Sequence, residues 1–270
     1  MTLSKSDYML FLRHPAWLWL KKFEKHKLPP IDDNLKALFE AGHLFESYAE
    51  KNFPQATKLG FNNYQQYLSL PHKTLEALNN GAESILQGRF ETDGLTCIVD
   101  VLEKISEQKV NLIEIKASTH AKPTHYYDLA FQSIVLQKSG FKVETIEVIH
   151  ANKKYVRDGA IDHTQITAKT EVTDKVKELI PLTIEQIDKA KEVLSSQTMP
   201  DLSPGLVNQV GVPGVSKWMQ EWLSTFLNLQ PQTDDYNIYA LSYPSPEQIA
   251  KLEEQGITNI KEMTEDQALR

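Results

Sequence analysis

Two carboxylates and a lysine lie on what the sequence predicts to be neighbouring strands. Asp100 stands in the run CIVDVLE, and Glu114 and Lys116 stand in LIEIKAST. If these strands form a hairpin whose loop centres on Glu107, residues whose numbers sum to about 214 oppose each other, which places Asp100 opposite Glu114. Opposed positions share a face, with their Cβ atoms roughly 4.5–5.5 Å apart. Because side chains alternate along a strand, Lys116 shares that face as well.

This trio could hold a metal ion and hydrolyse a phosphodiester bond. Two carboxylates so close on a half-buried sheet repel each other unless a positive charge lies between them. Mg²⁺ prefers oxygen ligands and keeps several waters, so Asp100, Glu114 and one backbone carbonyl would suffice. A water activated by the ion and positioned by Lys116 would then be a nucleophile. The alternative is a cross-strand salt bridge on a solvated sheet face, and the residues by themselves leave both interpretations open.

Composition and charge limit the classes of protein that remain. The net charge of −7 argues against a protein that coats nucleic acid, although it allows a local basic groove or a metal that bridges to phosphate. The single cysteine, Cys97, excludes an internal disulfide framework and a cysteine cluster for zinc or iron–sulfur, and it suits a reducing cytoplasm. The first residues are apolar but interrupted by charges and Pro15, so we expect neither a signal peptide nor a membrane span.

The elements around the trio alternate between helix and strand. Three consecutive antiparallel strands are predicted near residues 86–92, 95–103 and 110–117. A helix follows over PTHYYDLAFQSIVLQKSG, and KVETIEVIHANKKYV predicts one or two further strands. From about residue 181 onward the pattern is helical. The order predicts an α/β fold.

A second amphipathic helix is predicted upstream, over PPIDDNLKALFEAGHLFESYAEKNFP, and Asp32 or Asp33 can cap it. Glu46 falls on the apolar stripe of this helix, where an unpaired charge is costly. His43 is rotated away, toward Glu50. The stripe consists of residues at helical spacing: Leu35, Leu38, Phe39, Gly42, Phe45 and Ala49.

Six stretches, in this order, resemble the PD-(D/E)XK nucleases, and most closely their RecB-like branch, which includes the CRISPR-associated exonucleases. The stretches are LSKSDYMLFLRHPAWLWL, FEAGHLFESYAEKNFP, CIVDVLE, LIEIKASTHAK, DLAFQSIVL and VIHANKKYVRDGAID. The resemblance implies a restriction-endonuclease-like core, a mixed sheet flanked by helices, with helical N- and C-terminal additions. It implies one nuclease domain over residues 1–270, with the core at about 34–160 and a helical C-terminal lobe at about 180–270.

The resemblance also implies roles for the trio and its neighbour. Asp100 corresponds to the central metal aspartate, and Glu114 corresponds to the second metal carboxylate. The carbonyl of Ile115 corresponds to a backbone ligand of the metal. Lys116 corresponds to the catalytic lysine.

Two helices are expected to complete the site. Gln132 resembles the glutamine of a Q-x-x-x-Y motif, which contacts DNA or the lysine, although position 136 is leucine rather than tyrosine. Asp128 shares the helix face of Gln132. Two interpretations of Asp128 stay open: a solvated charge in the first turn of the helix, or a role at the site. The branch has G-x-x-x-H, but Glu46 stands at the histidine position here. We expect Glu46 to be the metal ligand and His43 to be a surface or supporting residue. An oxygen-only site suits Mg²⁺ or Mn²⁺ better than Zn²⁺.

An iron–sulfur cluster is present in several members of the branch, held by one cysteine before an N-terminal proline and three near the C-terminus. This chain has His14 before Pro15 and no C-terminal cysteine. We therefore expect no iron–sulfur cluster. Packing by Trp218, Trp222 and Phe226 is expected to close the helical lobe instead.

The function that the resemblance implies is a Mg²⁺- or Mn²⁺-dependent deoxyribonuclease, an exonuclease acting on single strands or DNA ends. The alternative is a nucleic-acid-binding or complex-forming module that keeps the fold with little catalysis. The departures at Leu136 and Glu46 favour that alternative, and the intact Asp100, Glu114 and Lys116 disfavour it. A protein partner or a homo-oligomer stays open, and a membrane partner is not expected.

Overall fold

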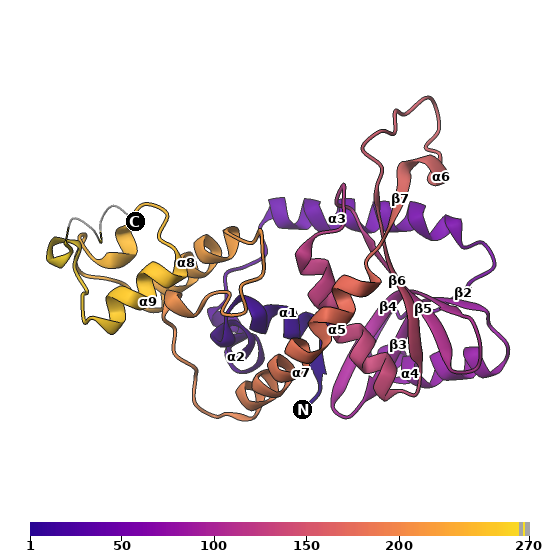
Figure 1. Cartoon of the computed structure of the whole chain (residues 1–270), viewed down its shortest axis with the longest axis horizontal. Coiled ribbons are helices and arrows are strands. Elements are labelled where there is room, and N and C mark those ends of the chain that lie inside the picture. The colour runs from indigo at the N-terminus through magenta and orange to yellow at the C-terminus, as the bar shows by residue number, and fades with distance from the viewer. Residues whose placement is uncertain (265–266, 268–270) are drawn as a thin grey trace. The chain divides into compact units, whose positions relative to one another are not determined.

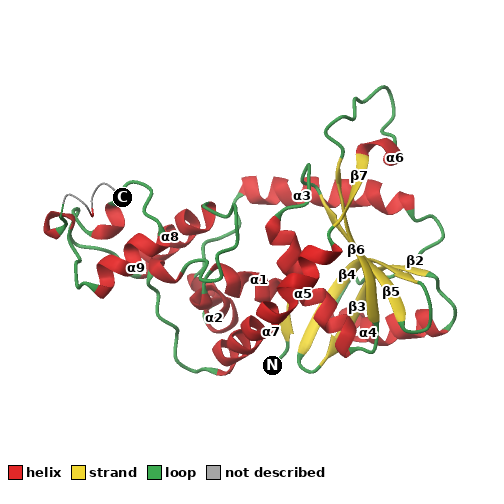
Figure 2. Ribbon diagram, viewed as in Figure 1, coloured by secondary structure: helices red, strands yellow, loops and turns green. Residues whose placement is uncertain are grey.

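The computed structural model describes residues 1–264 and Gln267, and it divides the chain into two compact units. The first unit comprises Met1–Lys5 and Ile31–Glu185. The second comprises Ser6–Pro30 and the chain from Gln186 onward. Figures 1 and 2 show that strands gather in the first unit and that helices make up the second. The single nuclease domain expected from the sequence stays a prediction.

A mixed β-sheet forms the centre of the first unit. Its strands are β1 (Leu3–Ser4), β2 (Thr57–Lys58), β3 (Ser84–Thr92), β4 (Leu95–Lys104), β5 (Lys109–Lys116), β6 (Lys142–Ala151) and β7 (Thr167–Glu171). The strand order is β2-β3-β4-β5-β6-β7, with β1 paired to β4. Neighbours in β3-β4-β5 are antiparallel, β5 and β6 are parallel, and β6 and β7 are antiparallel. The three predicted consecutive strands are therefore confirmed.

Helices cover this sheet and build the second unit. They are α1 (Lys5–Arg13), α2 (Pro15–Phe23), α3 (Asp33–Ala49), α4 (Tyr64–Asn79), α5 (Pro123–Lys138), α6 (His163–Ile166), α7 (Thr173–Ser195), α8 (Lys217–Leu229) and α9 (Pro246–Glu254). Single 3₁₀ turns lie at Lys25–Lys27, Glu50–Asn52, Pro204–Leu206, Ile238–Ala240 and Ile260–Glu262. The predicted α/β class is confirmed, because a mixed sheet flanked by helices is the arrangement expected of a restriction-endonuclease-like core. Among the described residues, no helix is long and apolar enough to span a lipid bilayer.

The hairpin register is the one that the sequence predicts. Val101 pairs with Ile113 and Leu102 pairs with Leu112, so each pair sums to 214. Val101 and Ile113 face α3, since both belong to a core cluster with Phe45 of that helix. Alternation along the strands therefore turns Asp100 and Glu114 toward the opposite face.

One edge of strand β4 has two different partner strands along its length. β3 pairs along one edge of β4, so β1 and β5 share the other edge. β5 pairs with β4 from Val101 to Lys104, whereas β1 pairs with Leu95 and Thr96. Between these contacts, residues 97–99 of β4 pair with β3 alone among the described strands, and Asp100 follows them. We call this opening, bounded by β1, β5 and residues 97–100, the strand fork.

The amphipathic stripe predicted for α3 is only half right. Asp32 caps the helix, because its carboxylate accepts a hydrogen bond from the Leu35 amide at 2.7 Å. Phe45 and Ala49 are buried against the sheet, as predicted. Leu38, by contrast, is 67% exposed and Phe39 is 49% exposed. The spacing shows which side of the helix is apolar, but only the C-terminal half of α3 packs against the sheet.

The second unit has its own apolar core, centred on Trp222. This fully buried ring donates its indole N–H to the Leu202 carbonyl at 3.0 Å. Phe226 belongs to the same cluster and Trp218 packs against it. The packing role expected for these three aromatic residues is therefore confirmed.

His14 joins α1 and α2 to that core. The ring stacks on Trp222 with centroids 3.8 Å apart, and its Nδ1 accepts a hydrogen bond from the Ala16 amide at 3.1 Å. Its Nε2 lies 3.0 Å from the Ser203 carbonyl, so the neutral Nε2–H tautomer satisfies both contacts. Burial lowers the pKa of His14 to about 4, despite the Ser203 carbonyl and the charge of Asp201.

The depressed pKa of His14 predicts a stability loss in acid. The unfolded chain binds a proton near pH 6.5 and the folded chain only near pH 4. The free energy of unfolding should therefore fall by up to about 3 kcal/mol as the pH drops through that window. The matched variant is His14→Asn, which retains a capping acceptor but does not titrate. Urea unfolding at several pH values should give a smaller loss for this variant; equal losses would contradict the assignment.

Candidate active site

Glu114 lies at the centre of a buried polar cluster beside the strand fork. Its side chain is 1% exposed, yet three donors from different parts of the chain reach it. Oε1 accepts hydrogen bonds from Lys5 at 3.0 Å and from Lys116. Oε2 accepts from the Gln132 amide at 2.7 Å. The predicted neighbours Glu114, Lys116 and Gln132 are thus brought together, and Lys5 joins them.

Asp128 belongs to the same cluster, so the interpretation as a solvated helix-end charge is wrong. Its carboxylate accepts from Lys116 at 3.1 Å and from Gln132 at 2.9 Å. Lys5 lies 3.4 Å away. The reason is the burial of α5, which is covered on almost all sides, so that Asp128 points into the protein rather than into water.

Asp100 lies at the fork itself, opposite the Glu114 position. Its Oδ2 accepts a hydrogen bond from the Ile115 amide at 2.7 Å, which takes the place of a backbone pairing between β4 and β5. Burial raises the pKa of Asp100 to about 8, and the charge of Glu114 adds to this rise. Lys5 and Lys116 oppose the rise only in part. The cluster therefore favours one more positive charge near Asp100.

The carboxylates around them also change the pKa values of the two lysines. Burial lowers the pKa of Lys5 and of Lys116, but the nearby carboxylates, Asp128 first, outweigh it and hold both values above the ordinary range. Burial likewise raises the pKa of Asp128, but the two ammonium groups outweigh it and hold the value well below the usual range. Both lysines are thus charged at neutral pH, whereas the raised pKa of Asp100 keeps that carboxyl largely protonated there.

Glu46 is placed differently from the other predicted site residues. It lies on α3, and its carboxylate meets the Gln87 amide and, at 3.5 Å, the His43 ring. The β3–β4 register sets Gln87 across from Asp100, and Gln87 has a left-handed backbone with φ of 59°. Glu46 therefore contacts β3 through Gln87. The His43 side chain is 80% exposed, in keeping with a surface position.

The donor set suits a hard divalent cation, although the ligands are not assembled around one point. Asp100, Glu114 and the Ile115 carbonyl supply oxygen, which Mg²⁺ and Mn²⁺ prefer. The pKa of Asp100 is raised first by burial and then by the charge of Glu114, and the two lysines offset this rise only in part. Gln132 Oε1 is buried and finds no hydrogen-bond partner among the described residues. Among the residues that the structure describes, no three His, Cys, Asp or Glu side chains lie close enough together to hold one ion. Glu46 as a metal ligand therefore stays a prediction.

Sequence reasoning overlooked Lys5. It stands in LSKSDY, a stretch that resembles the nuclease family, but nothing in its spacing relates residue 5 to residue 114. The parallel pairing of β1 with β4 creates that proximity.

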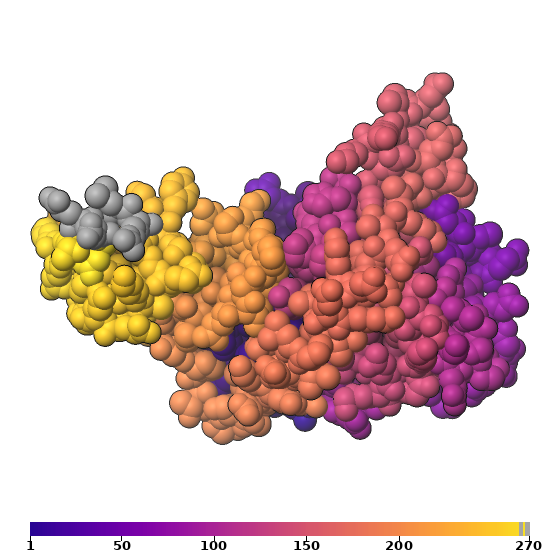
Figure 3. All heavy atoms as spheres, viewed as in Figure 1, coloured from indigo at the N-terminus to yellow at the C-terminus, as the bar shows by residue number. Residues whose placement is uncertain are grey.

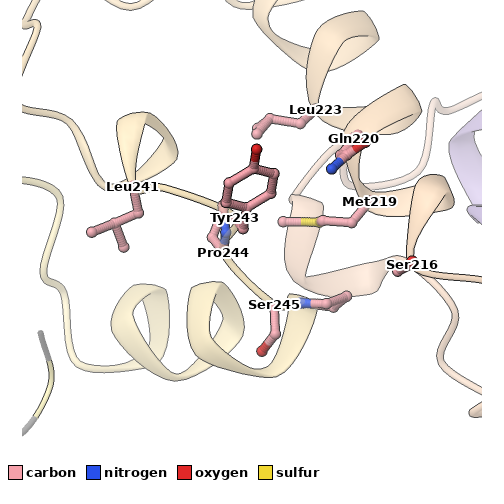
Figure 4. Close-up of a pocket in the computed structure, with 9 residues that line it drawn as sticks. Ser216, Met219, Gln220, Leu223, Leu241, Tyr243, Pro244 and Ser245 are labelled. Carbon is pink, nitrogen blue, oxygen red and sulfur yellow. The ribbon is translucent and has the colours of Figure 1, made fainter. Parts of the chain in front are cut away.

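A separate hollow of about 620 Å³ lies in the second unit. Figure 4 shows Met219, Leu223 and Tyr243 among the side chains that line it. None of the predicted site residues lines it. The hollow is mainly apolar and lacks the paired charges of the cluster around Glu114.

Comparison with known proteins finds no family model that matches this chain. No curated protein matches it either. Among the solved structures that are similar to it is an alkaline exonuclease from Laribacter hongkongensis, at 10% identity and a TM-score of 0.26. The alignment covers 69% of this chain and 95% of that one. Another is a phage-related exonuclease from Haemophilus somnus 129PT, at 11% identity and a TM-score of 0.24, covering 61% and 85%. At these TM-scores the similarity carries no argument about function.

The charge balance predicts opposite stability effects for two similar substitutions. Asp100→Asn removes a carboxyl that ionises less readily in the folded than in the unfolded chain, and it should stabilise the metal-free protein by about 1–3 kcal/mol at pH 7. Since the pKa of Asp100 is raised to about 8, the parent should lose stability relative to this variant as the pH rises from about 4 to 8. Glu114→Gln leaves two ammonium groups short of a partner and should cost about 3 kcal/mol or more.

Thermal and urea unfolding in EDTA measure both effects. Added Mg²⁺ should raise the melting temperature of the parent and leave that of Asp100→Asn unchanged. If both variants destabilise the protein equally and Mg²⁺ has no effect on the parent, the cluster is an ordinary salt bridge.

Proposed function

We propose that this protein is a metal-dependent nuclease that hydrolyses phosphodiester bonds in DNA. The observation that carries the proposal is the meeting of Asp100, Glu114 and Lys116 at an opening of the sheet, with Gln132 bonded to Glu114. Two carboxylates, one with a raised pKa, and an adjacent ammonium are the groups that metal-assisted hydrolysis requires. Exonuclease action on single strands or ends follows from the sequence resemblance.

Each residue of the site would have a separate role in hydrolysis. Asp100, Glu114 and the Ile115 carbonyl would hold Mg²⁺ or Mn²⁺, which when bound supplies Lewis acidity at the phosphodiester. Lys116 would orient the attacking water and stabilise negative charge that develops on the phosphate. Gln132 keeps Glu114 in place, since its amide bridges Glu114 and Asp128.

A loop of the sheet unit supports contact with the DNA backbone. It joins β6 to β7 and projects from the sheet, as Figure 3 shows in the salmon-coloured segment. Lys153, Lys154 and Arg157 are exposed on it. These cations would bind phosphates irrespective of base sequence, and such binding weakens as salt concentration rises. They offer the local basic surface that the overall acidic charge does not exclude.

A second candidate is a binding or complex-forming module with little catalysis. The bonding of Glu114 favours it, because two ammonium groups and an amide already occupy this carboxylate. Under this alternative the cluster is structural, and any bound nucleic acid or protein partner is left intact. The nuclease proposal requires instead that a divalent ion and DNA together produce cleavage.

Substitution of Lys116 separates the two candidates. Lys116→Met should retain the fold, since Lys5 still pairs with Glu114, and it should reduce cleavage of a labelled oligonucleotide in Mg²⁺ or Mn²⁺ at least about 100-fold. The control is Lys109→Met, which removes an exposed lysine paired with Glu144 at 3.1 Å. It should cleave at the parental rate.

Single-stranded, blunt-ended and circular DNA substrates test the form of attack, and an exonuclease should spare the circle. Parental cleavage by Lys116→Met would refute the role of this lysine. Failure of the parent to cleave any substrate in either metal, with binding retained, would establish the second candidate.

A further inference from the structure

Lys5 reaches the cluster because of the way the N-terminal strand is inserted. Leu3 pairs with Leu95 and Ser4 pairs with Thr96, parallel to β4. β5 runs antiparallel to β4 on the same edge. The C-terminal ends of β1 and β5 therefore point toward each other across the strand fork. Lys5 follows β1 directly, so its ammonium arrives at the end of β5, where Glu114 lies.

Lys5 contacts one of the proposed metal ligands, Glu114, and the neighbouring Asp128. Its Nζ lies 3.0 Å from Glu114 Oε1 and 3.4 Å from Asp128. Each carboxylate oxygen has two lone pairs, and Lys5 and Lys116 together take those of Glu114 Oε1. Gln132 takes one of the pairs on Oε2. A cation that binds Oε1 must therefore displace a lysine, and one that binds the remaining lone pair of Oε2 still lies close to both ammonium groups and is repelled by them.

The two lysines are not equivalent. Lys116 lies on the same strand as Glu114, two residues away, and it approaches Asp128 more closely than Lys5 does, at 3.1 Å against 3.4 Å. Lys5 comes from the far end of the chain and is held to this cluster by one hydrogen bond and one longer ion pair. Lys5 is thus the donor whose removal disturbs the trio least.

We propose that Lys5 is an internal counter-ion of the metal site, which neutralises Glu114 in the metal-free protein and competes there with the divalent ion. The inference rests on the proposed function, since it requires a metal at Asp100 and Glu114. Lys5 is a positioning residue rather than a catalytic one. It keeps three buried carboxylates stable while no ion is bound, and it lowers the affinity for the ion. A purely structural ion pair would stabilise the fold equally with and without metal.

The chain provides a matched control for this competition. Glu144 also has two lysine partners, Lys109 at 3.1 Å and Lys142 at 3.0 Å, but it is more exposed than Glu114. Lys109→Met and Lys5→Met both remove one of two ammonium groups from a glutamate and leave the other. Only the second change touches the proposed metal site.

The experiment measures Mn²⁺ affinity by calorimetry and melting temperature in EDTA and in saturating Mn²⁺. Lys5→Met should bind Mn²⁺ with a Kd roughly tenfold lower than the parent, because a competing charge is gone. It should melt below the parent in EDTA, and Mn²⁺ should close most of that gap. Lys5→Arg, which keeps the charge, and Lys109→Met should resemble the parent in both measurements.

The remaining outcomes separate the two proposals. If the parent binds Mn²⁺ and loses it in Asp100→Asn, while Lys5→Met binds no more tightly, the counter-ion role is refuted and the metal site stands. If neither the parent nor Lys5→Met binds Mn²⁺, both proposals fail. If Lys5→Met folds only when Mn²⁺ is present, the exchange of ammonium for metal is supported. If it fails to fold even with Mn²⁺ while Lys5→Arg folds, Lys5 is purely structural.

Discussion

The balance of charge around Glu114 is the constraint on which the site depends. Asp100, Glu114 and Asp128 are three carboxylates placed where water has little access, and Lys5 and Lys116 supply only two positive charges. Buried charges are tolerated only when they are paired and hydrogen-bonded. Asp100 therefore keeps a proton at neutral pH, because burial and the charge of Glu114 raise its pKa to about 8. A divalent cation would remove this imbalance.

Sheet topology produces that cluster. β4 has β3 along one edge, and its other edge is divided between β1 and β5. The division leaves the strand fork, where the side chains of Lys5, of Asp100 in β4 and of Glu114 near the end of β5 come together. Helix α5 places Asp128 and Gln132 beside them. An uninterrupted hairpin of β4 and β5 would have paired the backbone of Ile115 with β4. Here the Asp100 carboxylate takes the Ile115 amide instead.

The sequence was sufficient for the local parts of the site and insufficient for the distant ones. The hairpin register follows from alternation and loop position, so the Asp100–Glu114 placement could be predicted. The burial of Asp128 could not, because a first-turn acid looks the same on a solvated helix and on a covered one. Lys5 was missed because its contact spans 109 positions along the chain and depends on a two-residue strand. For α3 the apolar spacing indicated a side but not how much of its length would be covered.

Anomalous diffraction from crystals grown with Mn²⁺ can show whether Asp100 and Glu114 share a divalent ion. We expect a single strong anomalous peak within about 2.5 Å of oxygen atoms from Asp100, Glu114 and the Ile115 carbonyl. That peak should be absent from crystals of Asp100→Asn. A map without a peak at these residues, at Mn²⁺ concentrations that saturate any binding seen in solution, would show that Asp100 and Glu114 do not share an ion.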